Sequence, residues 1–146
     1  DAPHDTLPPG PFVRALIAEV RKAGLEARST IQSFDFRTLE VVQREAPGIA
    51  TSYLTQKQNG AAVPRMIRQA GGSAWSPAFS DLDAAALAEA RALGLKIVVW
   101  TVNERADIGR MIRLGVDGII SDRPDRVRTV MRRHRLALPA ATPVAP

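Results

Sequence analysis

The chain repeats one pattern: a helix-like segment ends in a glycine, and a short apolar run follows within a few residues. The four glycines are Gly24, Gly71, Gly94 and Gly115. Glycine often follows a helix because it adopts the left-handed conformation without steric cost. Three of the apolar runs end at Asp35, Asn103 or Asp122, where the next helix-like segment begins. Strands that alternate with helices of about ten residues predict an α/β fold with a parallel sheet.

The periodicity places five strands and six helices along the chain. We expect strands near residues 28–34, 49–54, 74–76, 96–101 and 116–121, and helices near 11–23, 36–45, 62–70, 82–93, 104–114 and 124–133. Residues 1–10 read as a leading loop, 11–135 as one domain and 136–146 as a flexible tail. No glycine-rich phosphate fingerprint follows the first strand, so about half of a TIM-type barrel fits better than an open doubly wound sheet.

Composition narrows the function classes. A complete eight-stranded barrel needs about 250 residues, whereas this chain has 146. It has no cysteine, which excludes disulfides and thiolate chemistry, and no apolar run long enough to span a membrane. The net charge of +5 is concentrated in residues 104–135, which contain nine arginines and five acidic residues. No aromatic residue follows Trp100, so we read this region as a solvated helical face and expect no nucleic-acid partner.

Three segments together resemble the C-terminal half of the glycerophosphodiester phosphodiesterase family. They are residues 31–35, 94–103 and 115–124, and the likeness extends over about residues 12–130. The resemblance implies a TIM-type barrel, with parallel strands, from a metal-dependent hydrolase. Such an enzyme splits glycerophosphodiesters into glycerol 3-phosphate and an alcohol, in lipid and glycerol metabolism.

The family's catalytic motifs lie in its N-terminal half: a His-Arg-Gly, a Glu-x-Asp, a His-Asp and a Glu-x-Lys. Only His4-Asp5 matches any of them, and these residues lie in a proline-rich segment with no strand before it. We therefore expect no catalytic residue and no metal ligand in this chain, which is predicted to be inactive by itself. The resemblance implies Ca²⁺ or Mg²⁺ for the full barrel only.

The candidate substrate-binding residues follow the strands, because the C-terminal ends of barrel strands form the active site. They are Phe34, Trp75, Trp100 and Asn103. The three aromatic residues are expected to form an apolar pocket wall, with packing in the core as the alternative. Asn103 is expected either to bind substrate or to cap the next helix, and capping is the simpler role for both Asp35 and Asp122.

Half of a parallel barrel would leave two open sheet edges and an exposed inner face. We therefore expect a partner, either the missing N-terminal half of the barrel or a second copy of this chain. An alternative is a non-catalytic half-barrel that dimerises or binds an anionic partner through its arginine-rich helices, and another is a different phosphate-handling barrel enzyme. The start at Asp1 and the Ala/Pro-rich end resemble exported bacterial members of the family, which favours a periplasmic location.

Overall fold

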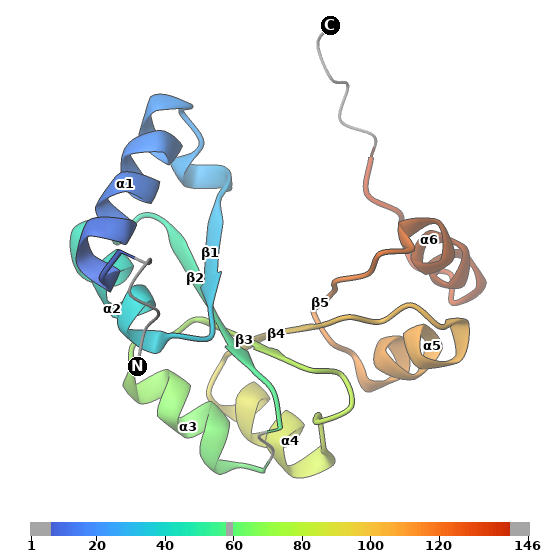
Figure 1. Cartoon of the computed structure of the whole chain (residues 1–146). Helices are drawn as coiled ribbons and strands as arrows, with labels where there is room; N and C mark the ends of the chain where they lie inside the picture. Colours follow the sequence, from blue (N-terminus) through green and yellow to red (C-terminus); the bar gives the residue numbers. More distant parts are fainter. Residues whose placement is uncertain (1–6, 58–59, 141–146) are drawn as a thin grey trace, which may run out of the picture.

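The computed structural model describes residues 7–57 and 60–140 (Figure 1). Five strands alternate with helices as the glycine pattern predicts, and α1 precedes the first strand. The strands are β1 (Thr30–Ser33), β2 (Ala50–Thr55), β3 (Ala74–Pro77), β4 (Lys96–Val99) and β5 (Gly118–Ile119). The helices are α1 (Pro9–Lys22), η1 (Glu26–Arg28), α2 (Phe36–Glu45), α3 (Ala62–Gln69), α4 (Ala84–Ala92), α5 (Arg105–Leu114) and α6 (Pro124–Arg133).

All five strands are parallel, and their order in the sheet is their order in the chain. The sheet curves with the helices on its outer side, and none of the described helices covers the inner side (Figure 1). This is the α/β arrangement expected from the sequence. Because sequential parallel strands with outer helices are the repeating unit of a TIM-type barrel, the structure has the architecture of an incomplete one.

The two sides of the sheet differ in burial. Side chains that face the helices form the core, and Tyr53, Trp75 and Ile97 are aligned side by side there, each at most 1% exposed. Their neighbours along the strands point inward and include Gln32, Ala50 and Lys96, which are exposed. This alternation follows from the period of two in a strand. The inner face is therefore open where these three residues lie, whereas Ser52 and Ser76, which also point inward, are only 4% and 1% exposed.

The end of α5 is representative of the four helix endings. Gly115 caps α5 in the left-handed conformation, with φ of 72°. Gly24, Gly71 and Gly94 also have positive φ. The glycine signal in the sequence is therefore confirmed at every one of these helices.

Two boundaries differ from expectation. The first helix begins at Pro9, two residues before the expected start near residue 11. Residues 1–6, which include His4, lie outside the described part. The last strand has two residues where 116–121 was expected. Asp117 explains part of the difference, because its carboxylate accepts a hydrogen bond from the Ile97 backbone N–H at 2.9 Å. The Ile97 N–H is therefore not available to pair with the backbone of a longer β5 strand.

Candidate functional site

Two aromatic side chains meet at the C-terminal ends of β1 and β4. Phe34 and Trp100 both continue the inward-facing positions of their strands, and their rings contact edge to face with centroids 5.5 Å apart. The Trp100 indole N–H donates to the Ser76 carbonyl at 2.8 Å, which fixes the ring over β3. Phe34 is 57% exposed, so this pair presents an apolar surface at the mouth of the half-barrel. The strand-end position predicted for both residues is confirmed.

Trp75 lies elsewhere, and the expectation that it lines the pocket is wrong. Its side chain points to the helices, is 0% exposed, and donates from its indole nitrogen to the Thr55 hydroxyl at 2.8 Å. The reason is strand parity: Trp75 is aligned with the core residue Tyr53, whereas inward positions fall on Ala74 and Ser76. Trp75 is therefore a core residue.

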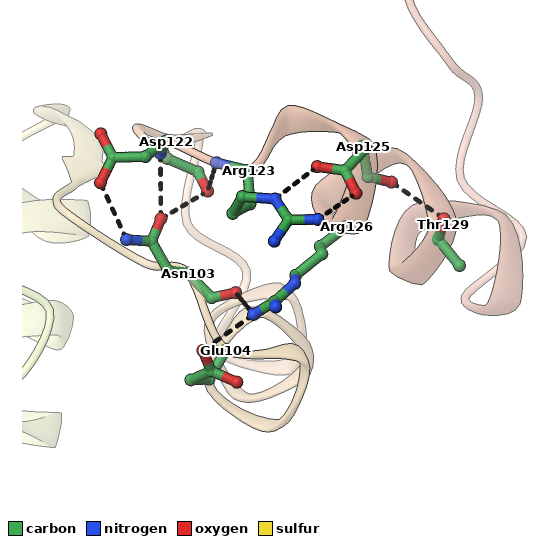
Figure 2. Close-up of polar contacts among 8 residues, drawn as sticks. Asn103, Glu104, Asp122, Arg123, Asp125, Arg126 and Thr129 are labelled. Carbon is green, nitrogen blue, oxygen red and sulfur yellow. Dashed lines mark hydrogen bonds and ion pairs between the residues drawn. The ribbon is translucent and has the colours of Figure 1, made fainter.

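Asn103 joins the loops that follow β4 and β5 (Figure 2). Its carboxamide oxygen accepts from the Asp122 backbone N–H at 2.9 Å and the Ser121 hydroxyl at 3.0 Å. Its amide nitrogen donates to the Asp122 carboxylate at 2.9 Å. The helix-capping alternative for Asn103 is wrong, because the position before α5 is Glu104. Three hydrogen bonds thus hold the Asn103 side chain at the mouth.

The two strand-end aspartates behave differently. Asp35 caps α2 as expected, since its carboxylate accepts from the Arg37 backbone N–H at 3.1 Å. Asp122 does not cap α6, whose preceding residue is Arg123, because Asn103 holds its carboxylate. The side chain of Arg37 also binds Asp35, with a shortest distance of 2.7 Å. This hydrogen bond lowers the pKa of Asp35 below its usual value.

Ion pairs fix α6 against the start of α5 (Figure 2). Arg126 donates to the Asn103 carbonyl at 3.1 Å and to the Glu104 carboxylate at 2.8 Å. The Arg123 guanidinium donates two hydrogen bonds to the two carboxylate oxygens of Asp125, at 3.0 and 2.9 Å. These bonds lower the pKa of the Asp125 carboxyl. From the sequence, these arginines are expected only to form a solvated charged face. Nothing in the spacing of Arg126 identifies an acceptor on another loop, so its role is visible only in the structure.

The described residues do not form a metal site. Within residues 7–57 and 60–140, no group of three His, Cys, Asp or Glu side chains is close enough to hold an ion. The strand-end carboxylates are also engaged, Asp35 by Arg37 and Asp122 by Asn103. A hard divalent cation needs several converging oxygen ligands, and this set does not fit one. In the same part of the chain, no helix combines the length and the apolar character of a membrane span.

Comparison with known proteins agrees with this geometry. A glycerophosphodiester phosphodiesterase of Caldanaerobacter subterraneus subsp. tengcongensis is 29% identical over 119 residues, which cover 81% of this chain and 48% of that protein. Among solved structures, a glycerophosphoryl diester phosphodiesterase homologue from Silicibacter pomeroyi DSS-3 superposes with a TM-score of 0.82 and 37% identity. That match covers 88% of this chain and 46% of the other.

A phosphodiesterase from Oleispira antarctica, solved with its product sn-glycerol-3-phosphate, is 16% identical and shares the fold with a TM-score of 0.75. The match covers 85% of this chain and 50% of that one. The chain thus spans about half the length of the proteins that it matches. The model of the glycerophosphoryl diester phosphodiesterase family matches residues 5–126, and the chain belongs to this family.

Proposed function

We propose that this chain is the C-terminal half of a metal-dependent glycerophosphodiester phosphodiesterase. The whole enzyme would hydrolyse glycerophosphodiesters to glycerol 3-phosphate and an alcohol. The family match over residues 5–126, in a chain about half as long as its relatives, carries the proposal. The Oleispira antarctica phosphodiesterase was solved with the product sn-glycerol-3-phosphate, which is the phosphate product proposed here.

In this proposal the chain forms part of the substrate pocket. Phe34 and Trp100 provide an apolar wall against the carbon skeleton of the glycerol or of the alcohol. Asn103 contributes a hydrogen-bond donor. Its side-chain oxygen already accepts two hydrogen bonds, but only one of the two N–H bonds of its amide nitrogen is used, in the contact with Asp122. An N–H held in place in this way suits an oxygen atom of the substrate.

The reacting groups would come from the rest of the barrel. Hydrolysis of a phosphodiester needs a group that neutralises the phosphate charge and an acid that protonates the leaving oxygen. Arg37 keeps the pKa of Asp35 low, so this carboxylate stays ionised and is a poor acid. The Asp122 carboxylate accepts a hydrogen bond from Asn103. The chain is therefore assigned binding and structural roles, and the Ca²⁺ or Mg²⁺ site belongs to the completed barrel.

The arginine-rich helices offer less support for the alternative of an anion-binding module. Arg123 pairs with Asp125, Arg126 with Glu104, and Arg110 with Asp107, at 2.9, 2.8 and 3.6 Å. These guanidinium groups already have acidic partners within the chain. The positive charge of these three arginines is therefore partly neutralised, which weakens the attraction of an anion to the surface around them.

The test compares the isolated chain with the completed barrel. Glycerophosphocholine is incubated with Ca²⁺, and glycerol 3-phosphate is measured by a coupled dehydrogenase assay. We expect no product above background from the chain alone. We expect turnover from a full-length protein in which this segment follows the first strands of the barrel. In that full-length protein, replacing Trp100 with Ala should raise KM because the pocket wall is lost. Turnover by the isolated chain would contradict the assignment.

A further inference from the structure

A hollow beside the Phe34–Trp100 pair, at the ends of β1 and β2, has the size of a small-molecule site. Its volume is about 540 Å³, within the range of about 300–1,000 Å³ that is common for ligand pockets. The described residues that line it are Phe34, Phe36, Leu54, Thr55, Gln56 and Met66. We propose that this hollow, the side pocket, binds the alcohol moiety of the substrate and selects choline, whose trimethylammonium group donates no hydrogen bond. The proposal rests on the proposed function, in which this chain forms part of the substrate pocket.

The side pocket begins at the apolar surface that the proposed function assigns to the substrate. Phe34 contacts Trp100 with ring centroids 5.5 Å apart, and the same Phe34 side chain lines the side pocket. The described lining comes from two consecutive strand–helix units, β1 with α2 and β2 with α3. It therefore lies between neighbouring units of this chain and not on the inner face of the sheet. A substrate whose phosphate lies at the mouth would reach it by extending its alcohol past Phe34.

The lining of the side pocket suits a bulky group with an apolar outer surface. The Phe36 ring packs edge to face on the buried Tyr53 ring, with centroids 4.7 Å apart, which fixes the Phe36 side of the pocket. Met66 is 42% exposed, so its thioether is accessible to a ligand. Quaternary ammonium groups bind beside aromatic rings because the ring electrons attract the cation. A methionine side chain is a polarizable apolar neighbour that adapts to the shape of such a group.

Ethanolamine fits this pocket poorly, because its ammonium group has three N–H donors that need acceptors. In the described lining, only Thr55 and Gln56 have a side-chain oxygen. Thr55 is buried, and its hydroxyl accepts from the Trp75 indole N–H at 2.8 Å. The described lining contains no carboxylate, and the neighbouring Asp35 is bound by Arg37. A buried charged donor that lacks acceptors is unfavourable, so the pocket should discriminate against a primary ammonium group.

The loop that follows β2 is held in place where it carries Gln56. Lys57 has a φ of 57°, a conformation that is uncommon for a residue with a side chain. The Asp81 carboxylate, from the loop after β3, accepts a hydrogen bond from the Lys57 backbone N–H. Asp83 accepts from the Gly60 N–H at 3.0 Å. Two carboxylates of the next loop thus fix the rim of the side pocket before a ligand binds, which lowers the entropic cost of binding.

The first test measures kcat/KM of the full-length protein for glycerophosphocholine and for glycerophosphoethanolamine. We expect the ratio of the two values to favour choline at least about tenfold. Gln56→Glu should lower this ratio at least about fivefold, because its carboxylate accepts hydrogen bonds from the ethanolamine ammonium, whereas trimethylammonium has none to donate. Gln69→Glu makes the same chemical change at an exposed position at the end of α3, outside the described lining. This matched control should change the ratio less than about twofold.

The second test measures binding without turnover. The 146-residue chain is labelled with ¹³C at its methionine methyl groups, and choline chloride is the probe. The chain has three methionines, Met66, Met111 and Met131. We expect choline to shift the Met66 methyl resonance saturably and ethanolamine hydrochloride at equal ionic strength to leave it in place. Met111 is buried in the core and is the internal control, and Met66→Leu assigns the Met66 signal.

Three results would each overturn the proposal. They are a kcat/KM ratio below about twofold, equal effects of Gln56→Glu and Gln69→Glu on that ratio, and a Met66 resonance that choline does not shift. Absence of turnover with both substrates would count against the proposed function. A saturable choline shift of Met66 in that case would still support the side pocket, so the two conclusions fail separately.

Discussion

Gly72, between α3 and β3, occupies a position with no space for a side chain. A methyl group there would lie 2.6 Å from Ile67 Cγ2, 2.7 Å from Tyr53 Cε2 and 2.9 Å from the Ile67 carbonyl oxygen. Carbon atoms in contact are separated by about 3.5–4.0 Å, so each carbon contact would be too short by about 1 Å. We predict that Gly72→Ala destabilises the fold.

The neighbours of Gly72 cannot easily move away. Ile67 and Tyr53 are both 0% exposed, and the Tyr53 hydroxyl donates to the Ala70 carbonyl at 3.1 Å. The Ile67 carbonyl also accepts from the Gly72 N–H at 2.9 Å, so the methyl group would press on the atom that bonds its own residue. Overpacking of this kind costs about 1–3 kcal/mol, and we expect the upper part, about 2–3 kcal/mol.

Urea unfolding followed by far-UV circular dichroism measures this cost. Gly48→Ala is the matched control, because no heavy atom lies within 4 Å of its added methyl group. The control should stay within about 0.5 kcal/mol of the starting protein. Equal midpoints for the two variants would refute the reasoning, since they would mean that the packing between α3 and β3 yields to a methyl group without cost.

Two further predictions concern the strand ends. Asp35→Ala should reduce stability at neutral pH by about 1 kcal/mol through loss of the α2 cap, with the exposed ion pair to Arg37 adding little. The folded-state pKa of Asp35 is lowered, so its contribution is present above the unfolded pKa and is lost as pH falls through the folded one. The difference in urea midpoint should therefore shrink in acid, and a constant difference would contradict this. Asn103→Ala removes three hydrogen bonds between the loops after β4 and β5, so amide exchange in both loops should accelerate, with a loss of about 1–2 kcal/mol. Unchanged exchange there would show that the loops are held by other contacts.

The order and type of the elements were predictable because their signals are local. Gly115 and the other helix-ending glycines adopt positive φ, and Asp35 caps the helix that directly follows it. Such features depend on conformations within a few residues. The length of β5 was not predictable, because the Asp117 side chain takes a backbone donor of β4 that lies twenty positions earlier in the chain.

The aromatic residues of the site show a second limit. The sequence places both Trp75 and Trp100 before polar or turn residues, and a strand-end rule alone treats them alike. In the structure Trp75 is the second residue of β3, whereas Trp100 directly follows β4. Their strands carry them on opposite faces, since Trp75 is aligned with Tyr53 in the core while Trp100 meets Phe34 at the mouth. Parity relative to a known core residue separates them.

Polar residues at the ends of parallel strands can bind the helix that follows, the neighbouring loop or a substrate. Asp35 binds locally, because Arg37 lies two residues further on and offers both a backbone N–H and a guanidinium group. Asn103 and Asp122 are 19 residues apart, yet they follow the adjacent strands β4 and β5 and bind each other. Adjacent parallel strands place the loops that follow them side by side. A hydrogen bond between two such loops therefore competes directly with capping of the next helix. The competition leaves Asn103 fixed at the mouth, with one amide N–H that does not bind Asp122. In the proposed function this N–H is the donor that the loop after β4 offers to a substrate.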